Sequence, residues 1–531
     1  MPDNPPPTSL SKDPPTTDSS EVDFAGLSDD FTHDSASALA PGGALALNSR
    51  DTIVFYVQSI AASFLQWVLP PLNTYLFSAY LHAPAHIVAQ FTWLQWMAWV
   101  PRILFAVCSD YVTLFGYRRK LWLVLGWVMT VASVAAMAFS SVGAPYCDPQ
   151  VYPTCWNPKA NTTRAAYNFD APNRAAWYRT PTFFVHLGVA MVQASLDGVM
   201  VEYCHREPLA LRGRLQAFTY FISGLGILYA RFFGLFGLNA PRYGGTYDFS
   251  AGPAVAYMIG FGLSFVSLVL AICCFRDTHN HIKSLADWTT GLWRLLQNRA
   301  VYQLVVFRIC YSLFQSPLGT PIISWVTDIS IGWSNVMGRI LYVPTLIQIM
   351  RRGLQWNWRK CVGIASVFSI VLTALATFFV IYDVCRNQYF YLVILALSAI
   401  ALAFMTLMPG WVMVEVAGVG HEATIAALYG AMSNLMLPVA ARWRIIMNDA
   451  FPANTALLND AHTRDQVMYS HVISFSLQLV GVLFVVFLPT HRLPTLQLLA
   501  RNDRSPIAGV LVVLAYLVLI VFALQQSLYN Y

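Results

Sequence analysis

Charged residues are scarce in this sequence. Asp, Glu, Lys and Arg make up 11% of its 531 residues, whereas a soluble domain averages about 25%. Hydrophobic residues reach 57%, and apolar runs long enough to cross a bilayer core of about 30 Å recur along the chain. These runs lack the alternation of a transmembrane strand. The composition therefore excludes an ordinary soluble domain and predicts an all-α polytopic membrane protein surrounded by lipid.

The sequence also lacks the local signatures of common enzyme chemistries. It contains no GxxxxGK[ST] phosphate loop, no HExxH and no GxSxG stretch. Its nine cysteines form no CxxC pair and no Cys/His cluster with zinc spacing. No basic, aromatic-interleaved stretch indicates nucleic-acid binding. We therefore expect no enzyme, cofactor, metal site or nucleic-acid partner. An ATP-driven pump is disfavoured because no polar stretch is long enough for a nucleotide-binding domain.

Residues 1–50 lack the charged start and apolar core of a signal peptide. They are rich in Pro, Ser, Thr and Asp, and they carry eight acidic residues against Lys12 and Arg50. This composition predicts a disordered acidic tail. The remainder of the chain is basic, as expected where cytoplasmic loops hold the Lys and Arg.

Hydropathy divides the remainder into two sets of six apolar spans, followed by an extra span at 506–527. The twelve spans run over 53–80, 88–107, 121–142, 182–203, 213–237, 253–275, 300–326, 333–350, 361–382, 389–417, 421–441 and 467–489. We therefore expect an N-terminal half at 51–275, a cytoplasmic linker at 276–299, a C-terminal half at 300–489, and a basic loop with an additional helix at 490–531.

Loop charges predict the orientation of these spans. Every second loop carries most of the Arg and Lys, which places that side and the N-terminus in the cytoplasm. The long loop 143–181 then faces an oxidising compartment, where Cys147 and Cys155 are expected to form a disulfide. Asn161 begins a glycosylation sequon in the same loop, although so short a motif also arises by chance. The sequence specifies neither the plasma membrane nor an endomembrane, and no feature indicates an oligomeric state.

A short internal repeat relates the two halves. Val199–Glu202 reads VMVE, and Val412–Glu415 reads VMVE again, each at the end of the fourth span of its set. Two six-helix halves related as parallel repeats are the layout of the major facilitator superfamily. Glu202 and Glu415 are therefore expected at equivalent cytoplasmic helix ends. We assign both to a cytoplasmic gate, together with Arg206.

The loop between the second and third spans carries a second gate motif. It contains Asp110, a glycine turn at Gly116, and the cations Arg118 and Arg119. Ion pairs that break and form between two states are one way to bias a conformational equilibrium. The alternative is an ordinary basic cytoplasmic loop with a chance Asp, and we favour the gate.

Polar stripes on three spans predict a solvated cavity. Residues three, four or seven apart share one face of a helix, and a stripe on a single helix would more often join it to a neighbour. The stripes fall on the first, fourth and seventh spans, which line the cavity in the superfamily. The predicted cavity residues are Gln66 and Asn73, then His186, Gln193 and Asp197, then Arg308, Tyr311 and Gln315.

Arg102 lies within the second span and belongs to the same candidate site. It is expected to pair with Asp197 or to bind an anionic substrate, and snorkelling to the membrane surface is the alternative. Asp197 is the leading candidate for proton coupling because a carboxylate inside an apolar span is a functional-site candidate by default.

Four stretches of the sequence resemble the folate-biopterin transporter family, most closely its branch in eukaryotic microbes. They are Trp99 to Trp127 around the gate motif, Asp197 to Gln216, Gly237 to Asp248, and Leu354 to Arg359 together with Asp383 to Gln388 and Val414 to Gly418. The similarity covers roughly residues 50–530.

The resemblance implies secondary, proton-coupled transport of folate, biopterin or a related small metabolite. It equates Asp197 and Glu202 with the paired acids of the family. Arg102 stands where the family usually has Lys, and Ala106 where it often has Gly, and these two departures concern the substrate more than the fold. The alternatives are a facilitator-fold carrier of an unrelated solute and a receptor or scaffold that does not transport.

Overall fold

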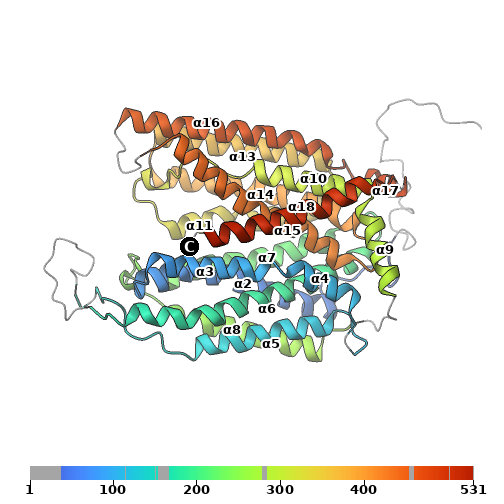
Figure 1. The fold of residues 1–531 in the computed structure, drawn as a ribbon, viewed down its shortest axis with the longest axis horizontal. Helices are drawn as coiled ribbons and strands as arrows, with labels where there is room; N and C mark the ends of the chain where they lie inside the picture. The colour runs from blue at the N-terminus through green and yellow to red at the C-terminus, as the bar shows by residue number, and fades with distance from the viewer. Residues whose placement is uncertain are drawn as a thin grey trace, which may run out of the picture.

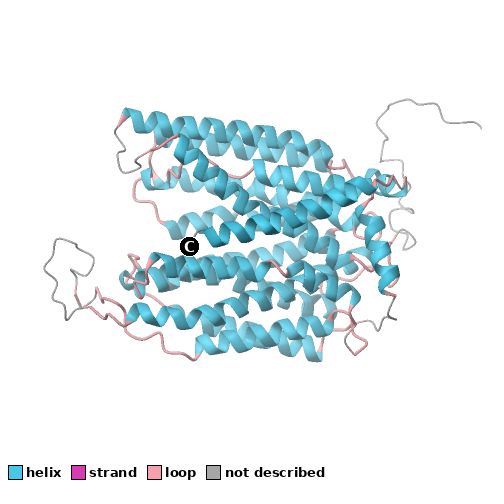
Figure 2. Cartoon of the chain, viewed as in Figure 1, coloured by secondary structure: helices cyan, strands magenta, loops and turns pink. Residues whose placement is uncertain are grey.

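The structure is a computed structural model that describes residues 38–113, 115–149, 151–152, 167–277, 284–453, 460–501 and 503–529. Within these ranges the chain is helical, and its extended pairings are two isolated bridges (Figure 2). Cys147 is disulfide-bonded. Its predicted partner Cys155 and the sequon residue Asn161 lie outside the described residues.

The N-terminal half contains the six expected spans, two of which continue into π-helical turns. The helices are α2 (Arg50–Leu72) with η3 (Asn73–Tyr80), α3 (Ala85–Trp99), α4 (Arg102–Tyr111), α5 (Lys120–Ala138), α6 (Ala171–His205), α7 (Arg214–Phe232) with η5 (Phe233–Gly237), and α8 (Pro253–Cys273). The second span is divided into α3 and α4 at Pro101, because proline has no N–H for the helical ladder.

The C-terminal half follows the linker helix α9 (Leu285–Leu296). Its helices are α10 (Arg299–Phe314), α11 (Ile331–Ile340), α12 (Tyr342–Arg352), α13 (Trp358–Ile381), α14 (Gln388–Val416), α15 (Glu422–Ala450) and α16 (Ala461–Leu483). The short α17 (Arg492–Ala500) and the apolar α18 (Pro506–Tyr529) close the chain.

The two halves lie side by side with their helices roughly parallel (Figure 1). They meet where α15 packs against α6 and α4, and where α7 packs against α11 and α12. We call the end that carries α9 and α17 the linker face. The opposite end, where α5 ends and α6 begins, is the loop face. α18 packs along α15 on the outside of the bundle.

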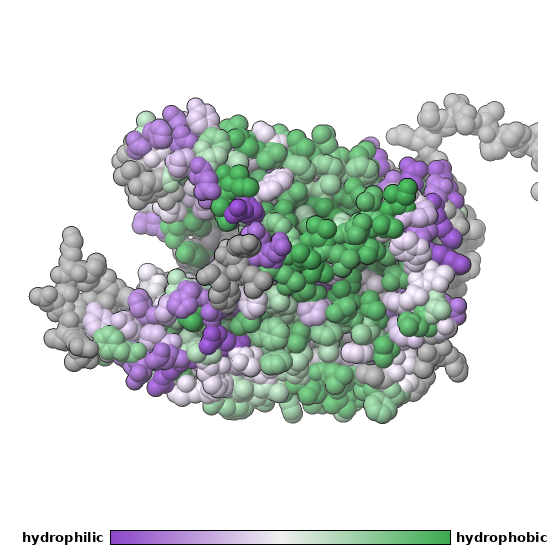
Figure 3. Space-filling view, viewed as in Figure 1, coloured by the Kyte–Doolittle hydropathy of each residue, from purple (hydrophilic) through white to green (hydrophobic). Residues whose placement is uncertain are grey.

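Ten helices of the described chain are long and apolar enough to cross a membrane by length and composition. The other three expected spans are the broken pairs α3–α4 and α11–α12 and the 16-residue α10. The span expected at 300–326 is shorter than predicted. α10 ends at Phe314, because Pro317 and Pro321 disfavour helix in the residues around them. Apolar side chains face outward over much of the surface (Figure 3), as a surrounding bilayer requires.

Part of the segment predicted to be a disordered tail is packed against the helices. Residues 38–49 lie against the linker face, where the Ala40 N–H donates to the His205 carbonyl at 3.0 Å and Arg214 donates to the Leu45 carbonyl at 3.0 Å. Ser49 then caps α2 by accepting from the Thr52 N–H. Composition alone did not separate these packed residues from the acidic segment before them.

Candidate functional site: a closed gate beneath an open cavity

Asp110 joins the two halves at the linker face. It lies near the end of α4 and is almost completely buried. Its carboxylate accepts the N–H groups of Ala423 at 3.2 Å and Thr424 at 2.7 Å, and the Thr424 hydroxyl at 2.6 Å. These groups belong to the first turn of α15, where a negative charge also interacts favourably with the helix dipole. One carboxylate of the N-terminal half therefore caps a helix of the C-terminal half.

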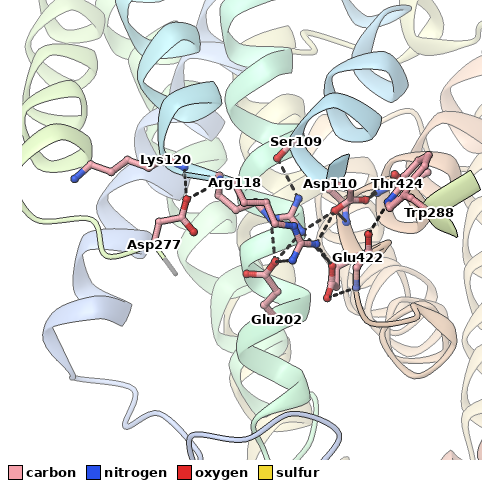
Figure 4. Close-up of polar contacts among 12 residues, drawn as sticks. Ser109, Asp110, Arg118, Lys120, Glu202, Asp277, Trp288, Glu422 and Thr424 are labelled. Atoms are coloured by element: carbon pink, nitrogen blue, oxygen red, sulfur yellow. Dashed lines mark hydrogen bonds and ion pairs between the residues drawn. The ribbon is translucent and has the colours of Figure 1, made fainter. Parts of the chain in front are cut away.

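Arg118 and Arg119 extend this contact into a buried ion network (Figure 4). Arg119 Nη2 lies 2.7 Å from Asp110 Oδ1 and 2.7 Å from Glu202 Oε1. Arg118 lies 3.2 Å from Asp110 and 3.3 Å from Glu202, and it also pairs with Glu422. Three acids thus surround two cations, which offsets the cost of removing each charge from water. We call these five residues the gate network.

A tight turn and a glycine without a side chain make room for the gate network. Phe115 and Gly116 have φ values of +53° and +82°, so the chain turns back sharply before the two arginines. Gly198 leaves the space that Arg119 occupies, since a Cβ there would lie 2.6 Å from the guanidinium carbon of Arg119. The Asp277 carboxylate accepts the N–H groups of Arg119 and Lys120 and fixes the start of α5.

A second ion cluster closes the other half of the linker face. Glu415 lies 2.9 Å from Arg212 Nη1 and 3.9 Å from Arg492 Nε. Trp411 donates to the Gly213 carbonyl at 3.0 Å, and the Arg492 guanidinium lies over the Trp411 ring. The repeated glutamates Glu202 and Glu415 therefore occupy related ion clusters.

The structure separates Arg206, which was also predicted to belong to the gate, from the ion pairs of Glu202. Glu202 pairs with Arg118 and Arg119, while the Arg206 guanidinium lies over the Tyr203 ring at 5.6 Å from its centroid. Residues 206–213 fold around a different acid, Glu207. Its carboxylate accepts from the N–H groups of Gly213 and Leu215. Burial raises the pKa of Glu207 to about 7, against the lowering effect of Arg214.

Arg102 and Asp197 form an ion pair between α4 and α6. The pair lines an inner cavity of about 290 Å³ between the two halves, and the predicted residues Gln66, Gln193 and Arg308 line the same cavity. Arg308 donates to the Ser433 hydroxyl at 2.9 Å and lies 4.6 Å from the centroid of the Tyr429 ring. Tyr220, Tyr342 and Tyr429 add aromatic rings to the wall.

A larger outer cavity of about 940 Å³ lies toward the loop face. Gln66 and Trp67 line both cavities, so the two cavities adjoin at these residues. His186 lines the outer cavity, as does Asn73, whose side-chain nitrogen lies 3.5 Å from the Gln95 amide oxygen. The bundle is hollowed at this end in Figure 3, whereas the gate network joins the halves at the other. The structure is therefore open at the loop face and closed at the linker face.

Tyr311 and Gln315 do not line the cavity as predicted. The Tyr311 hydroxyl lies 2.6 Å from the Ser366 hydroxyl on α13, and Gln315 donates to the Gln478 carbonyl on α16. Both contacts lie within the C-terminal half. Their spacing with Arg308 places them on a similar face of α10. However, helical periodicity does not specify which neighbour each side chain meets.

Several residues of the site were not predicted from the sequence. Glu422 pairs with cations about 300 residues away, and Gly198 contributes only space. Arg231 and Arg339 are visible as charges within apolar spans, a signal that could have marked them as candidate functional residues. The others are Glu207, Tyr220, Tyr342, Tyr429 and Arg492.

No family model and no curated protein matches the sequence. Solved structures do match the fold. The proton:xylose symporter XylE has a TM-score of 0.56 at 15% identity, with 85% of this chain and 98% of that chain covered. The human organic anion transporter MFSD10 gives 0.54 at 12% identity, covering 82% and 99%. A bacterial homologue of the iron transporter ferroportin gives 0.53 at 10% identity, covering 82% and 98%. The chain therefore has the major facilitator fold.

Proposed function

We propose that this protein is a secondary active transporter that moves folate, biopterin or a related small metabolite by alternating access. The observation that carries the proposal is the Arg102–Asp197 pair, which lies at a cavity between the two halves. The cavity is open toward one face while buried ion clusters close the other. In the reciprocal state, the gate network would separate and the loop face would close around the same central site.

Asp197 is the proposed proton carrier. As a carboxylate it neutralises Arg102. A proton that enters from the loop face and binds the Asp197 carboxylate removes this negative charge and frees Arg102 to bind an anionic group of the substrate. Release of the proton at the linker face would restore the ion pair and displace the substrate. Proton and substrate movement are coupled because the Asp197 carboxylate and the anionic group of the substrate compete for Arg102.

The lining of the inner cavity supports an aromatic, anionic substrate. Arg102 and Arg308 face one described acid, Asp197, so the wall has an excess of positive charge. The rings of Tyr220 and Tyr342 offer flat surfaces against which a heteroaromatic ring can stack. Gln66 and Gln193 supply both hydrogen-bond donors and acceptors, which suit a ring that carries both.

Purified protein in proteoliposomes tests this function directly. We expect saturable uptake of radiolabelled folic acid or biopterin, driven by an inward proton gradient and inhibited by the unlabelled compound. Protein-free liposomes provide the background. Absence of uptake of every folate and pterin in the panel, with retained uptake of another metabolite, would favour the carrier of an unrelated solute. Conductance without saturation would contradict a transporter of any kind.

A further inference from the structure

Two arginines from different halves share one tryptophan at the boundary between the inner and outer cavities. The guanidinium carbon of Arg231 on α7 lies 4.9 Å from the centroid of the Trp67 ring, and that of Arg339 on α11 lies 5.3 Å from it. Arg231 also donates to the Asn335 side-chain oxygen at 3.0 Å. Arg231, Trp67 and Asn335 line the outer cavity.

These two arginines have no carboxylate partner among the described residues. No Asp or Glu oxygen in that part of the chain lies within 4.0 Å of either one. The Nε of Arg231 is buried and makes no hydrogen bond. The one acid in the described lining of the outer cavity, Asp328, is exposed and pairs with neither arginine. Two like charges near one ring repel each other, and the ring offsets only part of that cost.

We propose that Arg231, Arg339, Trp67 and Asn335 form an outer anion subsite. It binds a carboxylate or phosphate group, with Arg231 and Arg339 supplying the charge and Asn335 an additional polar contact. Because Trp67 and Arg231 belong to the N-terminal half and the other two residues to α11, a bound anion also holds the two halves together at this depth.

The subsite specifies the substrate class further, and this step rests on the proposed function. The inner-cavity residues of α7 run from Thr219 to Ile227, so Arg231 lies four to twelve residues beyond them, which is about 6 to 18 Å along a helix at 1.5 Å per residue. An elongated solute can therefore place one anionic group near Arg102 or Arg308 and another at the outer subsite. Among pterins, a compound with a dicarboxylate tail fits this arrangement better than an uncharged pterin.

Uptake of three related probes tests the subsite. Folic acid has a pterin ring and a dicarboxylate tail, pteroic acid has the ring and a single carboxylate, and biopterin has the ring and an uncharged dihydroxypropyl side chain. In the double variant Arg231→Gln/Arg339→Gln, we expect the KM for folic acid to rise tenfold or more, with the KM for biopterin within twofold of wild type. Arg442→Gln, an exposed arginine that lines no described cavity, is the matched control. An equal change for all three probes, or no change for folic acid, would overturn the proposal.

If the wild-type protein transports none of these probes, the proposed function fails but the anion subsite is not yet tested. Fluorescence quenching then tests the subsite without transport. Iodide, an anionic quencher, should accumulate beside Trp67, whereas neutral acrylamide should not. We expect the Trp67 fluorescence, isolated by subtracting Trp67→Phe, to be quenched by iodide several-fold less in the double variant, with acrylamide quenching unchanged. Equal iodide quenching in wild type and double variant would overturn the anion subsite.

Discussion

At the residue scale, the gate network depends on the absence of a side chain at Gly198, which leaves room for Arg119. Arg119 reaches Asp110, Glu202 and Glu422 through the space above Gly198. The guanidinium is almost fully buried, so displacing it leaves carboxylates without their cation inside the protein. Breaking a buried pair in this way is more costly than losing an exposed one.

Gly198→Ala is therefore expected to weaken the closed gate. The added methyl group would clash with the guanidinium of Arg119, at a cost of about 1–3 kcal/mol for overpacking. Thermal denaturation in detergent should show the loss, and a cysteine placed at Thr424 should react faster with a maleimide. Gly363→Ala is the matched control because an added Cβ at that helical position meets no atom within 4 Å. Equal behaviour of the two variants would contradict the role given to Gly198.

Glu207 predicts a pH dependence at the linker face. Its folded-state pKa of about 7 is raised by burial above the ordinary value of 4.5. The stabilising contribution is therefore complete below pH 4.5 and is lost as the pH rises through 7. This loss is on the order of 3 kcal/mol. Thermal stability of the wild type should fall from pH 5 to pH 8, and Glu207→Gln should flatten that slope.

The control for this pH profile is Asp460→Asn. Hydrogen bonds from Thr463 lower the pKa of the exposed Asp460 carboxyl. Its contribution is therefore present above its ordinary pKa of 3.8 and does not change between pH 5 and pH 8. This variant should retain the wild-type slope. If Glu207→Gln also retained the full slope, another group would be responsible.

At the scale of elements, α17 contributes to the second ion cluster at the linker face. Arg492, its first residue, is buried and donates to the carbonyls of Leu209 at 3.1 Å and Ala210 at 3.3 Å. It also lies over Trp411 and near Glu415. A segment after the last helix of the C-terminal half thus holds the loop between α6 and α7 of the other half.

Arg492→Met should release this contact. The variant keeps much of the side-chain volume but removes the two hydrogen bonds to backbone carbonyls. The expected loss of stability is about 1–3 kcal/mol for each buried carbonyl left without a donor. We expect a lower melting temperature and faster maleimide labelling of Cys204, which is buried beside this loop. Arg501→Met, at the exposed end of the same helix, should match wild type. Unchanged labelling in Arg492→Met would remove α17 from the gate.

At the scale of the whole molecule, hydropathy predicted the helical membrane fold and the order of its spans. Local motifs also indicated Asp110, Arg118, Arg119 and the Arg102–Asp197 pair. The remaining contacts of the site depend on long-range packing, which local patterns do not reveal. The Glu422 contacts cross half the chain, and Tyr311 and Gln315 turn toward neighbours that a single helical pattern does not identify.

The central claim is that Asp197 couples proton movement to transport between two such halves. The most direct measurement is uptake by Asp197→Asn in proteoliposomes, with and without an inward proton gradient. The amide keeps the shape of the side chain but exchanges no proton. We predict that gradient-driven accumulation is abolished while the protein still enters the membrane and exchanges substrate across it. Asp503→Asn, an exposed acid outside the cavity, should accumulate substrate normally. Normal proton-driven accumulation by Asp197→Asn would contradict the account.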